Sequence, residues 1–161
     1  MLEQRVTLAF LFSKGVVYAV LEGTVTRRYR FCAAHRLHAD RLTLEENQAV
    51  FGKCNNPNGH GHNYVVLVTI KTEGADEAQE LERLDRTVDE TIVKRFDHQD
   101  LNGDPEFADR TTTGENLVKL IWDLLKTKLP DGRLEKVGVI ETRDNYFEYA
   151  HSSQPTGGAR G

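Results

Sequence analysis

Two histidines separated by one glycine, His60 and His62, form the pattern in this chain with the clearest chemical meaning. They stand where a loop meets a β-prone segment, residues 63–72. On a strand, residues i and i+2 point to the same face, so the two imidazoles can bind one metal ion. A catalytic zinc site commonly uses three protein ligands and leaves a fourth position open. His35 is the best third candidate if its segment pairs with residues 63–72; the alternative is a pair of surface histidines.

A second group that could do chemistry is the thiol of Cys54, six residues before His60. The intervening residues 55–59 (NNPNG) favour turns and would bring the thiol back towards the metal. A thiol near a divalent cation ionises more readily. Cys54 is either a fourth ligand of a closed structural site or a base beside an open site, and spacing does not decide between them. Cys32 lies among apolar residues of a β-prone segment, which predicts a buried thiol without a chemical role.

Two further places carry candidate chemistry. Asp97 and His98 follow an apolar helical stripe and could relay protons if the imidazole reaches the thiol, although such pairs are common on any surface. Glu141 ends an apolar β-prone run, where its carboxylate is either solvated or a bidentate acceptor for adjacent N–H groups of a heterocycle. His38 and His151 have no supporting context and are interpreted as solvated.

Composition and charge narrow the class of protein. The chain has 161 residues, which indicates one domain, and a formal net charge of −4. That balance argues against a nucleic-acid binder, which needs clustered lysine and arginine. No segment reaches the roughly 18 apolar residues that span a bilayer, so no membrane partner is expected. Two cysteines cannot form a secreted disulfide scaffold, so a reduced, cytoplasmic chain is the simpler interpretation.

The elements that must position these residues follow from hydrophobic periodicity. The β-prone segments are residues 24–34, 63–72, 134–142 and 145–150. Two amphipathic helices are predicted between the second and third segments, over residues 81–96 and 117–125. A capping box at Thr112 and Glu115 would start the second helix. The order β, β, α, α, β, β predicts an α+β fold with a four-stranded, largely antiparallel sheet.

The domain organisation follows from the same elements. Residues 24–150 would form the single domain. Residues 1–23 would be an N-terminal extension of uncertain structure, and residues 151–161 a disordered tail rich in small and polar residues. A small open sheet has exposed edges that are usually covered or paired, so pairing with another subunit is expected.

Several blocks of the chain resemble the family of 6-pyruvoyl-tetrahydropterin synthases and 6-carboxytetrahydropterin synthases. The segment Phe51 to Tyr64 (FGKCNNPNGHGHNY) is similar to the signature of the 6-pyruvoyl form over its full length. The other similar blocks are Ala34 to Leu37, Phe96 to Leu101, Thr113 with Glu115 and Asn116, and Val139 to Thr142. Each block is short, but their order and gaps across residues 25–150 are specific.

The resemblance implies the tunnelling fold, in which two helices cover one face of a four-stranded antiparallel sheet. Subunits of such proteins join their sheets into a barrel, and a homo-hexamer with active sites at subunit interfaces is implied. It also implies that His35, His60 and His62 bind Zn2+.

The same resemblance implies roles for the other candidates. Cys54 would be the proton-abstracting thiolate, with Asp97 and His98 completing a relay. Glu141 would anchor the pterin ring, helped by Thr113. The implied reaction converts 7,8-dihydroneopterin triphosphate to 6-pyruvoyl-tetrahydropterin with loss of triphosphate. No redox cofactor is needed, because side-chain oxidation and ring reduction are an internal redistribution.

Two alternative functions remain, and the chain departs from the family at two single positions as well as in its longer N-terminal part. The same scaffold could release acetaldehyde as well and form 6-carboxytetrahydropterin for queuosine synthesis, although that branch usually has a shorter gap between Cys54 and His60. A non-catalytic zinc-binding module would leave the other candidates without a role. Gly114 stands where many relatives carry threonine or serine, which leaves one pterin contact in question. Cys32 stands where serine is common.

Overall fold

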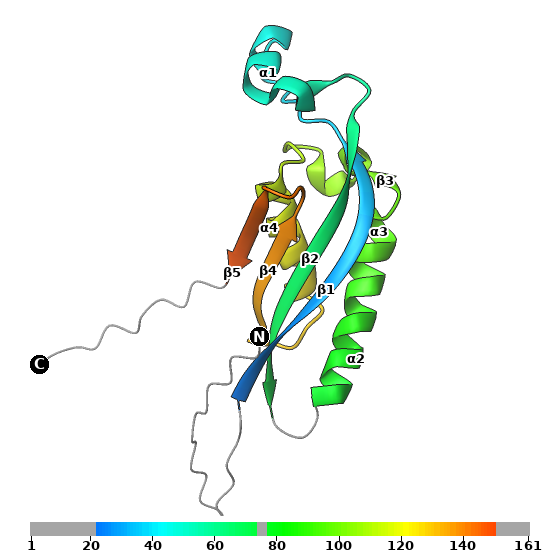
Figure 1. Cartoon of the computed structure of the whole chain (residues 1–161), viewed down its shortest axis with the longest axis vertical. Helices are drawn as coiled ribbons and strands as arrows, with labels where there is room; N and C mark the ends of the chain where they lie inside the picture. Colours follow the sequence, from blue (N-terminus) through cyan, green and yellow to red (C-terminus); the bar gives the residue numbers. More distant parts are fainter. Residues whose placement is uncertain (1–21, 74–76, 151–161) are drawn as a thin grey trace, which may run out of the picture.

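The computed structural model describes residues 22–73 and 77–150, which form one sheet with helices packed against it (Figure 1). The sheet has five strands in the order β3-β1-β2-β4-β5. Four of them pair antiparallel, each with its neighbour in the sheet. These are β1 (Glu22–His35), β2 (His60–Glu73), β4 (Leu134–Ile140) and β5 (Tyr146–Ala150). The predicted extension (1–23) therefore lies outside the described residues except at its end, and the predicted tail (151–161) lies wholly outside them.

The predicted count of four antiparallel strands is wrong, because a fifth strand lies beside the end of β1. This strand, β3 (Gln99–Asp100), pairs in parallel with Ala33 and Ala34. Two residues carry no periodic pattern, so a strand of this length leaves no signal in the sequence. The pairing fixes the residues just before it, Asp97 and His98, at the outer edge of β1.

β1 and β2 form a long antiparallel hairpin in which His35 lies directly opposite His60. Side chains of β1 alternate between two faces, as a strand requires. Phe31 and His35 are buried on the helix side, whereas Cys32 is exposed on the other side. The prediction of a buried Cys32 is therefore wrong, because residue 32 has the opposite parity from its apolar neighbour Phe31.

Two helical segments provide the other side of the core, as predicted over residues 81–96 and 117–125. The first segment runs from α2 (Glu77–Val88) through a π-helical turn, η3 (Asp89–Val93), into α3 (Lys94–Phe96). The second segment is α4 (Gly114–Lys126), which follows the short turns η4 (Leu101–Gly103) and η5 (Pro105–Phe107). Their apolar stripes form one buried cluster with the sheet, which includes Leu84, Ile92, Phe96, Leu117, Ile121, Tyr64 and Val66.

The start of α4 differs from the prediction by one residue. The N-cap is Thr113, whose hydroxyl accepts a hydrogen bond from the backbone N–H of Asn116. Thr112 is instead buried, and its hydroxyl donates to the carbonyl of Arg36. The predicted capping box at Thr112 and Glu115 is therefore wrong. Two adjacent threonines satisfy the same sequence pattern, and tertiary contacts decide which one caps the helix.

The segment between β1 and β2, for which no helix was predicted from the sequence, is partly helical. It contains α1 (Leu44–Phe51) and the 3₁₀ turn η1 (Gly52–Asn55), which project beyond the end of the sheet (Figure 1). Thr43 and Glu46 form the capping box of α1. Leu44 is 74% exposed, so this helix has no buried apolar stripe by which periodicity could have revealed it.

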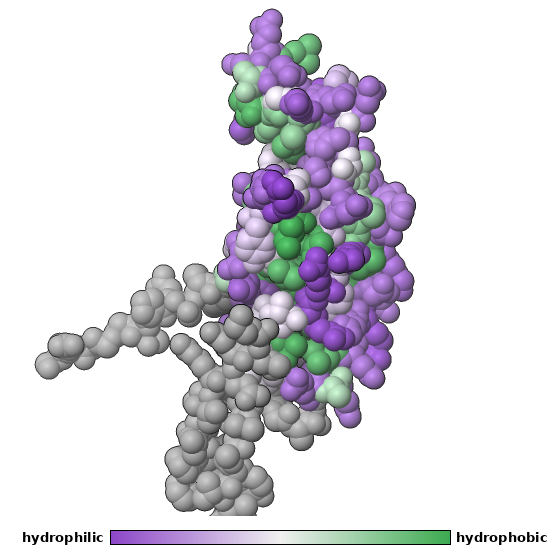
Figure 2. All heavy atoms as spheres, in the orientation of Figure 1, coloured by the Kyte–Doolittle hydropathy of each residue, from purple (hydrophilic) through white to green (hydrophobic). Residues whose placement is uncertain are grey.

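The face of the sheet away from the helices lacks a covering layer within residues 22–73 and 77–150. Figure 2, in which the sheet lies in front of α4, shows apolar side chains over the middle of this face with hydrophilic ones around them. Tyr146 is 48% exposed. Exposed apolar patches of this kind often mark a surface that another chain covers. In the described part of the chain, no helix has the length and apolar character to cross a membrane.

Gly114 has a packing reason that bears on stability. A Cβ at this position would lie 2.0 Å from Cε2 of Phe147, so the ring occupies the place of a side chain. We expect Gly114→Ala to lower the free energy of unfolding by about 1–3 kcal/mol, as overpacking does. Thermal or urea denaturation measures it. Gly103→Ala is the control, because nothing lies within 4 Å of its added Cβ. Equal stability of the two variants would contradict the packing argument.

Candidate functional site

The three histidines grouped in the sequence meet at one end of the β1–β2 hairpin. His35 lies opposite His60, and His62 lies opposite Ala33 on the same side of the sheet. One ring nitrogen from each histidine lies within 4.8 Å of the others, and Nε2 of His35 is 3.1 Å from Nε2 of His60. Among the described residues, this is the one group of three or more side chains that could hold a metal ion.

The surroundings of the three rings suit a divalent metal. Nδ1 of the buried His35 is 2.9 Å from the carbonyl of Thr112. Since a carbonyl only accepts, Nδ1 carries the proton and the lone pair of Nε2 faces the other histidines. Nδ1 of His60 is buried and lacks a hydrogen-bond partner in the described structure. An unsatisfied nitrogen in a set of three imidazoles fits zinc, which prefers such ligands.

Burial favours the neutral, metal-binding form of His35 and His62. Burial is the main cause that lowers the pKa of His35, and the neighbouring His60 acts in the same direction. Burial likewise lowers the pKa of His62, against an opposing effect of the Glu141 carboxylate. Because metal binding needs the unprotonated ring, these shifts favour occupancy near neutral pH.

The metal-free protein should therefore lose stability as the pH falls. A histidine whose folded pKa is depressed adds stability above its unfolded pKa of about 6.5, and this is lost as pH falls through the lower, folded pKa. We expect the melting temperature of chelator-treated protein to fall between about pH 7 and pH 5. The double variant His35→Gln/His62→Gln should show a flatter profile. An unchanged slope in that variant would assign the effect to other groups.

Tyr64 and Glu141 adjoin the histidines. Tyr64 is fully buried, and its hydroxyl is 3.5 Å from Nδ1 of His35. Burial raises the pKa of this phenol well above its usual value, and Glu141 and Cys54 add to the rise. Oε1 of Glu141 is 3.8 Å from Nε2 of His35, and its side chain is only 12% exposed, which argues against a solvated strand end. Sequence reasoning missed Tyr64, although residues 60, 62 and 64 share one face of a strand.

A tight turn holds the Glu141 carboxylate in this position. The backbone N–H of Glu141 donates to the carbonyl of Asn145 at 3.1 Å. The amide of Asn145 in turn donates to Oε2 of Glu141 at 3.2 Å. This leaves Oε1 directed to the histidine side, so the carboxylate can accept hydrogen bonds from a ligand that lies beside the rings.

The thiol of Cys54 lies beside the histidine group but is not part of it. Cys54 belongs to η1 and is half-buried, and its carbonyl accepts from the N–H of Leu37 at 2.9 Å. Cys54 is among the groups that raise the pKa of Tyr64, whose hydroxyl lies 3.5 Å from Nδ1 of His35. The metal-binding group found in the described residues does not include Cys54. The absence of Cys54 from this group fits a base beside an open site better than a fourth ligand.

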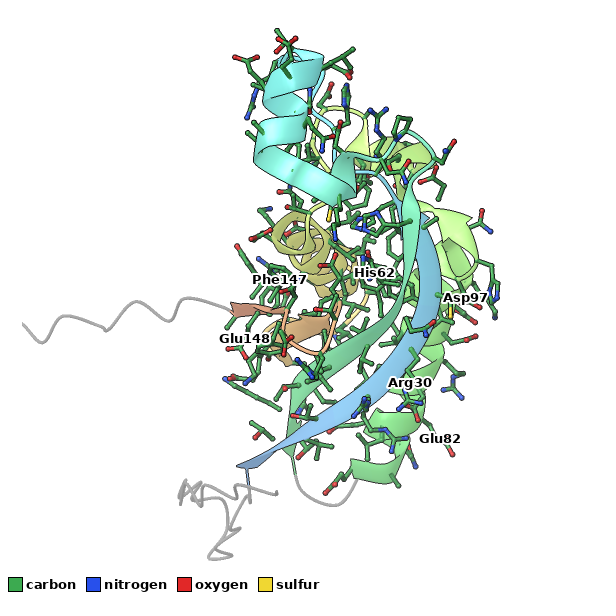
Figure 3. All side chains as sticks on the ribbon, turned by 45° about the horizontal axis from the view of Figure 1, so that its top comes forward. Arg30, His62, Glu82, Asp97, Phe147 and Glu148 are labelled. Atoms are coloured by element: carbon green, nitrogen blue, oxygen red, sulfur yellow. The ribbon has the colours of Figure 1, made fainter. Side chains whose placement is uncertain are left out.

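Asp97 and His98 lie away from the histidines within one chain. Figure 3 shows Asp97 beyond the outer edge of β1, whereas His62 lies on the β2 side. Oδ1 of Asp97 accepts from the N–H of Cys32 at 2.8 Å, and Oδ2 is 2.9 Å from Nδ1 of His98. The bond from Cys32 and that from His98 both lower the pKa of Asp97. The His98 side chain is 80% exposed, so the pair is open to solvent at the edge of the sheet where β3 joins β1.

The remaining candidates have mixed outcomes. Thr113 is the N-cap of α4, one residue after the Thr112 carbonyl that holds His35. His38 was interpreted as solvated, which is wrong: it is half-buried and its Nδ1 is 3.0 Å from Nδ2 of Asn55. His151 lies outside the described residues. A lone histidine near a turn gives no signal of its contacts, because these depend on how the turn folds back.

Comparisons with known proteins agree on one family. Residues 24–152 match the family model described as 6-pyruvoyl tetrahydropterin synthase. The chain is 46% identical over 132 residues to the 6-pyruvoyl tetrahydrobiopterin synthase of Homo sapiens. The aligned region covers 80% of this chain and 91% of that protein. The structure is similar to that of Caenorhabditis elegans 6-pyruvoyl tetrahydropterin synthase, with a TM-score of 0.75, 36% identity, and coverage of 81% of this chain and 96% of that one. The Plasmodium falciparum structure of that name has a TM-score of 0.55 at 13% identity, covers 80% of this chain and 96% of that one, and shows likeness of fold alone.

Proposed function

Because the chain belongs to the 6-pyruvoyl tetrahydropterin synthase family, we propose that it is a zinc-dependent lyase of tetrahydrobiopterin biosynthesis. Its reaction converts 7,8-dihydroneopterin triphosphate to 6-pyruvoyl-tetrahydropterin with loss of triphosphate. The observation that carries this proposal is the group of His35, His60 and His62 with the carboxylate of Glu141 beside it. A cytoplasmic location belongs to the same proposal and fits two free cysteines.

In this proposal the histidine site binds the side chain of the substrate, and Glu141 binds its pterin ring. His35, His60 and His62 would hold the zinc ion, which as a Lewis acid would acidify neighbouring groups of the substrate side chain. Glu141 accepts hydrogen bonds from adjacent N–H groups of the pterin ring, since charge-assisted bidentate bonds are strong and directional. Thr113, at the start of α4, helps to anchor the ring. The substrate side chain is thereby directed to the Cys54 side of the histidines.

Proton transfer is the work of Cys54, Asp97 and His98. The Cys54 thiolate takes a proton from a side-chain carbon of the substrate, and His98, paired with Asp97, moves protons to and from the thiol. Since Asp97 and His98 lie at the outer edge of β1, the pair that serves one site comes from a second copy of the chain. The proposed assembly, a homo-hexamer with active sites between subunits, would supply that second copy.

The free edges of the sheet support this assembly. Within the described residues, the outer edge of β1 pairs only at Ala33 and Ala34, and β5 pairs only with β4. Consecutive neighbours from β1 to β5 are antiparallel, so β5 of one copy would run antiparallel to β1 of the next. Joining these edges into a barrel removes both of them. It would also bring Asp97 and His98 of one copy to the side of the next copy where the Glu141 turn leads into β5.

A mixing experiment tests the shared site. We expect Cys54→Ala and Asp97→Asn each to lose activity as pure proteins. Co-expressed or re-assembled mixtures should regain up to about a quarter of wild-type activity, because some interfaces then pair an intact Cys54 with an intact Asp97. Mixing Cys54→Ala with His62→Ala is the matched control and should restore nothing, since both residues belong to the same half of the site. Equal recovery in both mixtures would contradict sites built from two copies.

Product analysis tests the reaction itself. Purified, zinc-loaded protein is incubated with 7,8-dihydroneopterin triphosphate, and products are identified by mass. The proposal expects 6-pyruvoyl-tetrahydropterin and triphosphate. Acetaldehyde would show instead the 6-carboxytetrahydropterin synthase reaction of the queuosine pathway, and no turnover with zinc bound would leave a non-catalytic zinc module. The relatives named above favour the first outcome.

A further inference from the structure

We propose that Asn55 is a positioning residue that fixes the Cys54 thiol relative to the metal ligand His35. The inference rests on the proposed function in one respect, namely that Cys54 is the base. It concerns the residue next to the thiol, which is 5% exposed although it lies in a turn of a projecting segment. A buried amide normally satisfies its hydrogen-bonding groups, so its partners indicate its purpose.

Asn55 joins the Cys54 turn to the chain that follows His35. Nδ2 of Asn55 donates to the carbonyl of Leu37 at 2.6 Å and to Nδ1 of His38 at 3.0 Å. Since an amide nitrogen only donates, Nδ1 of His38 is the acceptor. In return, Nε of Arg36 donates to the carbonyl of Asn55 at 3.1 Å. The N–H of Leu37 donates to the carbonyl of Cys54, so residues 36–38 hold both residues of the turn.

Residues 36–38 are themselves fixed to the body of the protein. Oδ1 of Asn102 accepts from the N–H of Arg36 at 2.7 Å, and Nδ2 of Asn102 donates to its carbonyl at 2.9 Å. The same carbonyl accepts from the hydroxyl of Thr112, whose own carbonyl holds His35. One continuous set of hydrogen bonds therefore links the orientation of His35 to the place of Cys54.

The need for this link follows from the path of the chain. The chain leaves the sheet after His35, forms α1 beyond the end of the sheet, and returns through η1 with Cys54 (Figure 1). The thiol thus lies in the projecting arm, the segment that contains α1 and η1 (residues 39–55), where few other contacts with the sheet would oppose a small displacement. Asn55→Ala would leave the carbonyl of Leu37 and Nδ1 of His38 without their donor, which favours a shifted turn.

Asn47 provides a matched control. It is also buried, and its Nδ2 donates to the carbonyls of Ala39, Leu42 and Thr43 within the same projecting arm. None of these groups belongs to the Cys54 turn. Loss of its amide should therefore weaken the arm without displacing the thiol, which separates positioning from general stability.

The test uses the zinc-loaded, full-length protein in a Cys32→Ser background, because the exposed Cys32 would also react with a thiol reagent. Five quantities are measured for Asn55→Ala and Asn47→Ala: zinc content, melting temperature, kcat, KM, and the pH profile of alkylation by iodoacetamide. For Asn55→Ala we expect bound zinc, a similar KM, and a fall in kcat of about 10- to 100-fold, since misplaced groups cost this much. The alkylation rate of Cys54 near pH 7 should change about threefold or more, as the thiol meets a new environment.

Three results would overturn the inference. One is an unchanged alkylation profile and kcat in Asn55→Ala. Another is an equal loss of kcat in Asn47→Ala, which would assign the effect to the arm as a whole. If Asn55→Ala does not fold, His38→Ala removes one of its partners and should shift the profile in the same direction, so no shift there is the third.

Failure of the proposed function would look different. It would appear as absent turnover in the parent Cys32→Ser protein despite bound zinc. The alkylation profiles of the Asn55→Ala and Asn47→Ala variants would then still decide whether Asn55 positions the thiol.

Discussion

Replacing Cys54 by alanine is expected to lower kcat by about 10²- to 10⁴-fold, the range typical of a lost general base, and to leave zinc bound. The reason is geometric. In the described structure, the metal-binding group consists of His35, His60 and His62, and the thiol lies outside it. Metal analysis of the purified variant beside its steady-state kinetics measures both halves of the prediction.

Cys32→Ala is the control for this experiment. It also removes a thiol, but from the exposed face of β1, where Sγ donates a hydrogen bond to Oδ1 of Asn63 at 3.0 Å. Its backbone N–H, which holds Asp97, is retained. We therefore expect activity within about threefold of the parent protein, as for a surface change. Loss of zinc from Cys54→Ala would contradict an open site and indicate a structural one with four ligands.

The second large effect is expected from His62→Ala. Removing one of three ligands should lower the zinc affinity and the turnover, each by about 10²-fold or more. Loss of a residue that merely supports a ligand already costs about 10- to 100-fold in affinity or activity. His62 makes ring contacts with His35, His60 and Tyr64, with centroids 4.8–5.6 Å apart. Zinc titration by a coloured chelator and the product assay measure the two losses.

His98→Ala separates ligand loss from histidine loss. His98 is exposed at the sheet edge and lies outside the metal-binding group. Its replacement should keep the zinc and lower turnover, whereas His62→Ala should lose both. If His62→Ala retained a full equivalent of zinc, the proposed ligand set would be incorrect.

The sequence predicted the parts of the site that depend on strand periodicity. His60 and His62 share a face because they are two residues apart, and His35 meets them because the hairpin register pairs it with His60. The two helices were predicted because their apolar stripes are long and regular. These features depend on local order along the chain and on one pairing of neighbouring segments.

Features that depend on tertiary contacts could not be predicted from the sequence. α1 has an exposed apolar residue, Leu44, instead of a buried stripe, so its capping box was the only local signal. β3 is too short for any pattern. The buried state of Asn55 depends on residues 36–38 folding against it, and a turn-forming asparagine looks the same whether or not it is buried.

The hydrogen bond from His35 to the carbonyl of Thr112 has a consequence for local opening of the fold. This carbonyl directly precedes the N-cap of α4, so the first turn of that helix and the metal-binding rings share one connection. A ligand that binds only the closed form raises the free energy of local opening by mass action. Chelation should therefore speed amide hydrogen exchange in the first turn of α4 more than in its last turn. The start of a helix that lacks any metal ligand would thus report the occupancy of the metal site.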